Sequence, residues 1–305
     1  MNIVLTPAVK IMKPLKVLLY GPTHSGKTYG SLKIAAGIVM QKNGCTEEEA
    51  YPRILFLDSE YKRGTLYAHF GKFNYMSIEP PYSVSELQDF FNKVETIPEI
   101  DVVIVDSLTH FWSKEGGILD EKAEKDKQGG NSYTNWQDYT SKFNKVLDSL
   151  LHSSKSVIVT TRSKNDTALV VNEKGKQAPV TYGLKPEMRD NIEYEFDIVF
   201  NVDKQTHSLI VDKGVPGMSM TYEPATAATG MELYDLVSAN AIVQERQPLE
   251  IIKAIRDAAK VHNLVSFVQL LLSGRKLDEM ERDQLLIVET AIVEEIKRKQ
   301  IKPKK

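Results

Sequence analysis

The chain has 305 residues, of which 42 % are apolar and 26 % are charged, and its 39 basic and 41 acidic side chains leave a net charge of −2. This composition excludes a wholly disordered, fibrous or globally basic chain, so we expect any contact with nucleic acid to come from local patches. The single cysteine, Cys45, excludes a disulfide framework and a cysteine-built zinc site. The first residues lack the pattern of a secretory signal, and no apolar run approaches the roughly 20 residues of a membrane span, so we expect a soluble, cytoplasmic protein without a membrane partner.

Short apolar runs alternate with amphipathic stretches from residue 15 to about residue 224, which predicts βαβ units and a mainly parallel sheet flanked by helices. The runs interpreted as strands are, in chain order, 15–20, 54–57, 74–78, 102–105, 157–161, 198–202 and 209–211. The last two flank a short polar turn and predict an antiparallel hairpin at the end of the sheet. Helices are expected over 27–40 and, from an apolar stripe at three-to-four-residue spacing, over 136–151.

Two polar segments interrupt this rhythm, and we expect both, residues 113–135 and 162–190, to be long loops that are functional or mobile. From about residue 246 the pattern is wholly helical and ends in a basic tail at 297–305, which is either a nucleic-acid contact or a solvated terminus. The sequence therefore predicts an α/β core at 1–245 and a small helical extension at 246–305.

A phosphate-binding loop is predicted between the first strand and the first helix, where the sequence fits G-x-x-x-x-G-K-[ST]. Glycines let such a loop wrap closely around phosphate, and its N–H groups together with the helix N-terminus attract negative charge. We expect Lys27 to reach the β- and γ-phosphates and Thr28 to hold Mg²⁺ through its hydroxyl. The predicted nucleotide-binding residues are Gly21, Pro22, Thr23, His24, Ser25, Gly26, Lys27 and Thr28.

Polar side chains follow three further strands, and ligands bind beyond the carboxyl ends of parallel strands. Asp106 is suited to the Mg²⁺ side of the site, or it caps a turn. The alternation of a strand puts Asp58 and Glu60 on one side, so Glu60 can activate a water, unless the two are a solvated pair in a loop. Arg162 either senses the γ-phosphate or is a surface arginine. The aromatic run at 110–112 either stacks on bases or packs at the rim of the sheet.

The order of these motifs resembles the RecA/RadA recombinase core, and most closely a phage group of RecA-core ATPases, some of which act as single-strand annealing proteins. The runs at 105–112, 159–164 and 188–197 carry the closer resemblance, which covers about residues 15–213 and leaves the helical extension unexplained. The resemblance implies a RecA-like P-loop NTPase core that uses ATP and Mg²⁺.

The same resemblance implies roles for single residues. Glu60 matches the family's catalytic glutamate, and Asp106 matches its aspartate on the Mg²⁺ side. Tyr67 stands where RecA has an adenine-stacking tyrosine, and Lys213 resembles a lysine that reaches the ATP of a neighbouring protomer. Arg162 stands where RecA carries an ATP-sensing glutamine, so the chain departs from the pattern there.

The two polar segments correspond to the two DNA-facing loops of the family, and helices are the alternative to loops in these segments. The cations expected to contact DNA are Lys164, Lys174, Lys176 and Arg189. The function implied is an ATPase that binds single-stranded DNA and promotes phage DNA recombination or strand annealing in the cytoplasm of a bacterial host. The partners implied are further copies of the chain, in a ring or filament, and a single-strand-binding protein.

Two alternative functions stay open. One is a helicase-like motor or loader that remodels DNA, against which the lack of a separate helicase accessory domain argues. The other is an ATP-gated DNA-binding module that does not hydrolyse ATP, against which the presence of Glu60 argues.

Overall fold

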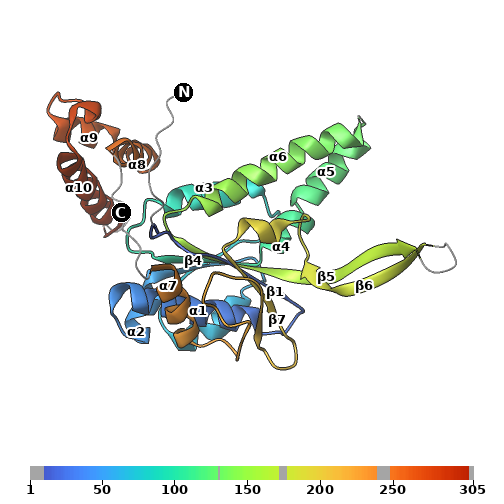
Figure 1. The fold of residues 1–305 in the computed structure, drawn as a ribbon. Helices are drawn as coiled ribbons and strands as arrows, with labels where there is room; N and C mark the ends of the chain where they lie inside the picture. The colour runs from blue at the N-terminus through green and yellow to red at the C-terminus, as the bar shows by residue number, and fades with distance from the viewer. Residues whose placement is uncertain (1–9, 130, 172–176, 239–247, 302–305) are drawn as a thin grey trace. The chain divides into compact units, whose positions relative to one another are not determined.

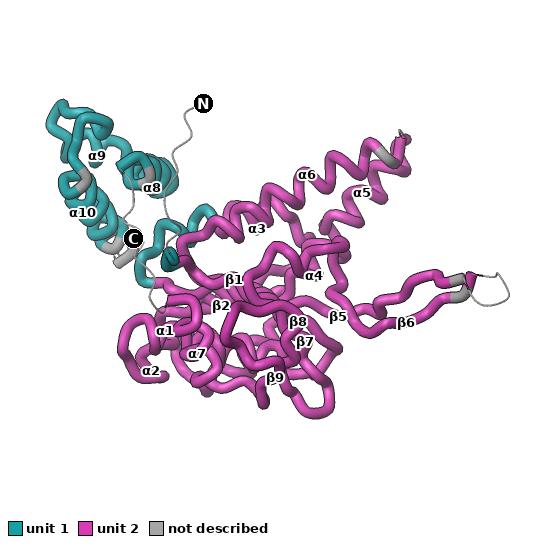
Figure 2. Tube along the Cα trace, viewed as in Figure 1, with its two compact units in different colours: residues 1–12, 92–99, 242–305 teal, residues 13–91, 100–241 magenta. Residues whose placement is uncertain are grey.

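The computed structural model describes residues 10–129, 131–171, 177–238 and 248–301. These residues form two compact units (Figure 2). The larger unit consists of the described parts of 13–91 and 100–241, and the smaller of the described parts of 1–12, 92–99 and 242–305. The predicted domain boundary between residues 245 and 246 lies outside the described residues.

The larger unit is built on a sheet to which the described residues contribute nine strands. The strands are β1 (Lys16–Gly21), β2 (Ile54–Asp58), β3 (Asn74–Ser77), β4 (Val102–Asp106), β5 (Ser156–Val171), β6 (Gln177–Pro186), β7 (Ile198–Val202), β8 (Leu209–Lys213) and β9 (Thr221–Tyr222). Their spatial order is β3-β2-β4-β5-β1-β7-β8-β9, with β6 paired to the outer part of β5. The strands from β3 to β7 along this order are parallel, and β8 and β9 are antiparallel, as the predicted terminal hairpin requires.

Helices cover both faces of the sheet (Figure 1). They are α1 (Lys27–Asn43), α2 (Glu47–Ala50), α3 (Val84–Val94), α4 (Leu108–Ser113), α5 (Ile118–Lys127), α6 (Ser132–Leu151) and α7 (Ala227–Ser238), with short 3₁₀ helices at Tyr51–Arg53, Arg63–Phe70 and Ile192–Glu195. Strands β1 and β4 are buried along their whole length, which explains their nearly continuous aliphatic sequence. The predicted α/β class, a mainly parallel sheet with flanking helices, is therefore confirmed.

Helix α1 lies between the sheet and α7, which the sequence analysis did not predict. The two helices approach so closely that a Cβ on Gly37 would lie 1.9 Å from the carbonyl oxygen of Ala227. A Cβ on Gly230 would lie 2.1 Å from the carbonyl oxygen of Ile34. Glycine at both positions permits backbone-to-backbone packing and holds the phosphate-loop helix against the core.

The prediction that residues 113–135 form a long loop was wrong, and the helical alternative describes most of them. They contain helix α5 and the first turn of α6. Helices α5 and α6 together form an antiparallel helical arm (Figure 1). Helix α5 is highly charged, but Asp120 and Glu121 lie in its first turn, and Lys125 and Lys127 in its last turn. These charges complement the helix dipole and stabilise a helix that has too few apolar residues to show a clear stripe.

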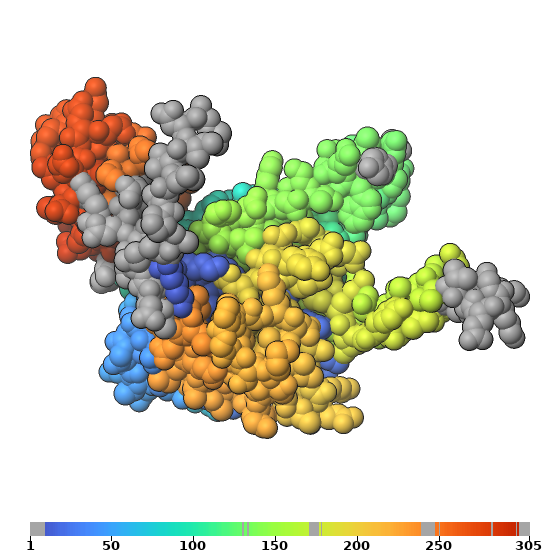
Figure 3. All heavy atoms as spheres, in the orientation of Figure 1, coloured from blue at the N-terminus to red at the C-terminus, as the bar shows by residue number. Residues whose placement is uncertain are grey.

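The second expected loop, residues 162–190, was also predicted wrongly. Strand β5 continues past the sheet and pairs antiparallel with β6, from Ser163 opposite Pro186 to Val171 opposite Gln177. The resulting two-stranded ribbon stands clear of the rest of the larger unit (Figure 3). Its outer part is exposed on both faces, so its sequence lacks the alternation of apolar and polar residues that marks a half-buried strand.

The smaller unit is helical, as expected for the C-terminal extension. Its helices are α8 (Pro248–Val261), α9 (Val265–Leu272) and α10 (Arg282–Ile301), with a 3₁₀ turn at Leu277–Glu279. Aliphatic side chains from all of them form a separate hydrophobic core. Across the part of the chain that the structure describes, every helix is too short or too polar to cross a membrane.

Candidate functional site

The predicted phosphate loop joins the end of β1 to the start of α1. A Cβ on Gly21 would lie 2.6 Å from the carbonyl oxygen of Val202 and 2.8 Å from Ser25 Oγ, so only glycine fits there. Gly26 has φ +93°, a left-handed conformation that glycine adopts without strain. The hydroxyl of Ser25 is buried and has no hydrogen-bond partner among the residues that the structure describes. A buried unpaired hydroxyl in a glycine-shaped loop is suited to an oxyanion ligand such as phosphate.

The ammonium group of Lys27 lies against this loop. Its Nζ donates hydrogen bonds to the carbonyl oxygens of Gly21 at 2.9 Å and Pro22 at 2.8 Å. Burial lowers the pKa of Lys27, and the nearby carboxylates of Asp106 and Glu60 partly oppose this shift. The site thus holds a buried cation close to two carboxylates.

The sheet order explains why these groups meet. Strands β2, β4, β5 and β1 are consecutive and parallel, so their carboxyl ends lie side by side at one edge. Asp58 of β2 and Asp106 of β4 are direct neighbours in register. Glu60 follows β2, Arg162 pairs with Gly21 across β5 and β1, and the phosphate loop follows β1. This edge is the place where open α/β sheets bind ligands.

Asp106 connects the phosphate loop to β5. Its Oδ2 accepts a 2.5 Å hydrogen bond from the hydroxyl of Thr28, and its Oδ1 accepts one from the hydroxyl of Thr160. The residue is only 4 % exposed, and burial raises its pKa although both hydroxyl bonds act in the other direction. A carboxylate and a hydroxyl in contact are hard oxygen donors, which fits the Mg²⁺ that a P-loop NTPase uses with its nucleotide. The remaining ligands of such an ion are phosphate and water oxygens.

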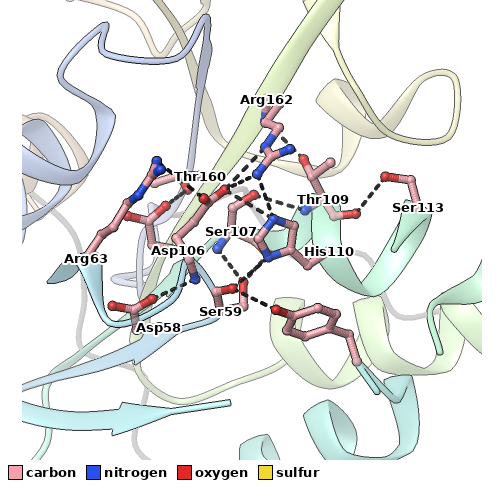
Figure 4. A network of polar contacts seen from close by, with 12 residues as sticks. Asp58, Ser59, Arg63, Asp106, Ser107, Thr109, His110, Ser113, Thr160 and Arg162 are labelled. Atoms are coloured by element: carbon pink, nitrogen blue, oxygen red, sulfur yellow. Dashed lines mark hydrogen bonds and ion pairs between the residues drawn. The ribbon is translucent and has the colours of Figure 1, made fainter. Parts of the chain in front are cut away.

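Glu60 contacts a cluster of cationic and imidazole groups. Figure 4 labels these groups, Arg63, His110 and Arg162. Its Oε1 is 2.9 Å from Nη2 and 3.3 Å from Nε of Arg162, and 3.2 Å from Nε2 of His110. Its Oε2 is 3.8 Å from Nη1 of Arg63. Burial alone would raise the pKa of Glu60, but the contacts with His110 and Arg162 outweigh it and lower the pKa to about 2. The carboxylate is therefore ionised at neutral pH and paired with Arg162.

His110 is a site residue that the sequence analysis did not assign. Its Nδ1 lies 2.8 Å from the carbonyl oxygen of Ser59, which only accepts, so Nδ1 carries a hydrogen. Nε2 lies 2.9 Å from Nη2 of Arg162. A neutral ring accepts a hydrogen bond at Nε2 from Arg162. A protonated ring donates a hydrogen bond from Nε2 to Glu60. In both states the buried ring contacts the Glu60–Arg162 ion pair and stabilises it. Of the two interpretations of residues 110–112, packing at the rim of the sheet describes these buried side chains.

The peptides after the two carboxylate-bearing strands are also joined. Ser59 Oγ donates to the carbonyl oxygen of Ser107 at 3.0 Å and accepts from the Ser107 N–H at 2.8 Å (Figure 4). The Ser59 carbonyl oxygen accepts a further 3.1 Å bond from the hydroxyl of Tyr82. A signal for this pairing is visible in the sequence, because both strands end in the dipeptide Asp-Ser.

Asp58 is buried and structural, so the alternative interpretation of Asp58 and Glu60 as a solvated pair in a loop does not describe it. Its carboxylate accepts from the N–H of Glu60 at 2.6 Å, the N–H of Gly64 at 2.7 Å and the hydroxyl of Tyr75 at 3.0 Å. Strand β2 ends at Asp58, so the side-chain alternation of a strand does not extend to Glu60. The direction of the Glu60 side chain follows from its partners on α4 and β5 instead.

Two residues implied by the family resemblance, Tyr67 and Lys213, do not stand at the ends of these four strands. Tyr67 is in the 3₁₀ helix after β2 and packs on Phe70 with 5.6 Å between ring centroids. Burial, followed by the charge of Asp106, raises the pKa of Tyr67. Lys213 pairs with Val199 near the start of β7, whereas the phosphate loop follows the opposite end of the neighbouring strand β1, and its Nζ donates to the carbonyl oxygen of Tyr194 at 2.7 Å. The roles of both residues stay predictions.

The cations predicted to contact DNA are only partly described. Lys174 and Lys176 lie outside the described residues. Lys164, at the base of the ribbon, donates to the carbonyl oxygen of Met188 at 3.2 Å. Arg189 follows the ribbon and forms a 2.6 Å ion pair with Glu195. Each described cation of this set thus has a partner within the chain.

Comparison with protein families matches residues 13–230 to a family model described as an AAA domain. The match begins before β1 and ends within α7, so it contains the phosphate loop and all four strand ends described above. No curated protein matches the chain.

Proposed function

The chain belongs to the AAA domain family and is a nucleotide-binding protein of the P-loop ATPase type, and we propose that it hydrolyses ATP with Mg²⁺ and acts on single-stranded DNA. The observation that carries the hydrolysis is that Lys27 and Thr28 after β1, Asp106 at the end of β4 and Glu60 after β2 meet at one edge of the sheet. Such a set combines phosphate binding, metal binding and a carboxylate for the attacking water.

In this proposal each residue of the edge has one task. The N–H groups of the loop and Lys27 hold the β- and γ-phosphates, and Thr28 and Asp106 hold Mg²⁺, which supplies charge neutralisation at the phosphates when it is bound. Glu60 orients the attacking water. A carboxylate with a pKa of about 2 is a weak base at neutral pH, so Glu60 must loosen its contact with Arg162 before it accepts a proton. Arg162 then becomes free to face the γ-phosphate, which supports its assignment to the catalytic set.

The experiment that tests hydrolysis compares wild type with Lys27→Ala and Glu60→Gln. We expect Lys27→Ala to lose nucleotide binding and Glu60→Gln to keep it, while turnover in Glu60→Gln falls by about 10²–10⁴-fold because a general base is removed. The matched control is Glu79→Gln, which makes the same change at a side chain that is 67 % exposed. Full turnover in Glu60→Gln contradicts the role assigned to that residue.

The β5–β6 ribbon supports the proposal of DNA binding. It presents Tyr182, which is 66 % exposed and offers an aromatic face on which a base can stack. Its Lys185 is paired with Asp166 and Asp190 at 3.2 and 3.3 Å in exposed surroundings. Exposed pairs of this kind contribute about 0–1 kcal/mol, so exchanging the partner for a DNA phosphate costs little.

The same turnover assay separates the candidate functions when single-stranded and duplex DNA are added in turn. Stimulation by the single strand alone favours recombination or annealing, which we propose takes place on phage DNA in a bacterial host, with assembly into a ring or filament and alongside a single-strand-binding protein. Equal stimulation by duplex DNA favours a motor or loader. DNA binding that requires ATP without measurable turnover favours the ATP-gated module.

A further inference from the structure

The turn between β7 and β8 lies against the phosphate loop, and its conformation is fixed by its own residues. The Oδ1 of Asp203 accepts from the N–H groups of Gln205 at 2.9 Å and Thr206 at 2.8 Å, and from the hydroxyl of Thr206 at 2.9 Å. The N–H of His207 donates to the carbonyl oxygen of Asp203 at 3.1 Å. His207 itself has a left-handed backbone conformation with φ +59°. The turn therefore holds His207 in one position.

The imidazole of His207 contacts the phosphate loop directly. Its Nδ1 lies 3.0 Å from the carbonyl oxygen of Ser25. A carbonyl oxygen only accepts, so Nδ1 carries a hydrogen and donates it. The ring also packs on the next residue, since a Cβ on Gly26 would lie 3.5 Å from Nδ1 of His207.

This hydrogen bond controls the direction of one peptide unit. The Ser25–Gly26 peptide is planar and trans, so its C=O and N–H point in opposite directions. When the Ser25 carbonyl oxygen is held by His207, the Gly26 N–H points away from His207. Gly26 precedes the first residue of α1, where N–H groups bind phosphate, and its left-handed backbone gives this peptide more freedom to turn than an ordinary residue allows.

We propose that His207 is a positioning residue for nucleotide binding, which holds the Ser25–Gly26 peptide with its N–H toward the phosphates. The inference rests on the proposed function, because it takes the loop to be the ATP site. His207 contacts the loop at the Ser25 carbonyl oxygen, whereas the partners of the Glu60 carboxylate are Arg162, His110 and Arg63, so we expect its loss to affect binding of nucleotide and to leave the chemical step nearly unchanged. The donor at Nδ1 is the feature that matters, and the size of the ring is secondary.

The test uses the full chain with Mg²⁺ and a fluorescent ATP analogue, and compares three substitutions at one position. Asparagine places an amide N–H where Nδ1 lies, whereas glutamine extends it to the place of Nε2 and alanine removes it. We expect His207→Ala and His207→Gln to weaken nucleotide affinity by about 3- to 10-fold, the loss of one hydrogen bond, and His207→Asn to remain within about twofold of wild type. Maximal turnover should change less than twofold in all three variants while KM follows the affinity.

The matched control is His152→Ala. His152 also donates from Nδ1 to a backbone carbonyl oxygen, that of Asp148 at 2.8 Å, but it lies at the end of α6. Wild-type affinity in His207→Ala, or equal loss in His207→Asn and His207→Gln, overturns the proposal. If His207→Ala does not fold, the comparison of asparagine with glutamine decides alone. A wild-type chain that binds no nucleotide refutes the proposed function together with this inference, whereas normal wild-type binding with an insensitive His207 refutes the inference only.

Discussion

Replacing Glu60 by glutamine should reduce the amount by which the free energy of unfolding of the larger unit falls at acid pH. The pKa of Glu60 is lowered from its ordinary value of 4.5 to about 2; burial opposes the shift, and the contacts with His110 and Arg162 outweigh burial. Because the pKa in the folded state lies below that in the unfolded state, the ionised carboxylate stabilises the fold above pH 4.5, and this stabilisation is lost as the pH falls through 4.5 toward 2.

The magnitude follows from the size of the shift. At 1.36 kcal/mol per pKa unit, the full contribution is about 3 kcal/mol, of which about 2 kcal/mol is lost by about pH 3. The Glu60 side chain is only 14 % exposed, so solvent screening removes a small part of this figure. Glutamine keeps the shape but does not titrate, so the free energy of unfolding of Glu60→Gln should fall by about 2 kcal/mol less than that of wild type between pH 7 and about pH 3.

The assay is urea unfolding followed by tryptophan fluorescence across this pH range. Both tryptophans of the chain, Trp112 and Trp136, belong to the larger unit and stack with 6.0 Å between ring centroids, so their emission reports unfolding of the unit that contains Glu60. Glu79→Gln, which changes an exposed carboxylate, should follow the wild-type curve. Equal acid losses in wild type and Glu60→Gln would refute the reasoning, because the ion pair would then contribute nothing that depends on ionisation.

Two further predictions concern DNA and assembly. Replacing Lys174 and Lys176 together by alanine should weaken binding of single-stranded DNA and reduce the slope of log affinity against log salt by about 0.7 for each lysine; an unchanged slope removes both from the DNA site. Lys213→Ala should bind ATP but hydrolyse it slowly, and mixing it with Lys27→Ala should restore part of the turnover at mixed interfaces, since one variant supplies the phosphate loop and the other supplies Lys213. Normal turnover of Lys213→Ala alone, or a protein that stays monomeric with ATP and single-stranded DNA, contradicts a site shared between subunits.

The local parts of the site were predictable from the sequence. The phosphate loop is a contiguous run whose glycines and flanking apolar strand are visible in one window, and the structure places the loop between β1 and α1 as expected. The strands that end at Asp58 and Asp106 were also predicted, because parallel strands that are buried on both faces consist of continuous runs of aliphatic residues. The α/β class follows from these signals, and the structure confirms it.

Polar elements that protrude from the core were predicted wrongly. Helix α5 is stabilised by charges at its ends and by contacts with α6, such as the 2.5 Å ion pair of Glu121 with Lys142, more than by an apolar stripe. The β5–β6 ribbon is held by backbone hydrogen bonds between its own two strands, and such bonds do not require an alternation of apolar and polar side chains. Both segments were therefore interpreted as loops.

The sequence by itself determined which residues follow the buried aliphatic runs of β1, β2 and β4, because apolar runs and glycine patterns are local. Only the tertiary structure decided which partners those residues meet: Glu60 lies beside Arg162 and His110, and Ser25 lies beside His207, across separations of 50 to 182 residues along the chain. These contacts depend on the order of strands in the sheet, on the path of the chain after β2 and on the path of the turn between β7 and β8. Hydrogen bonds between such distant segments form only after the hydrophobic core has brought them together, so no spacing in the sequence records them.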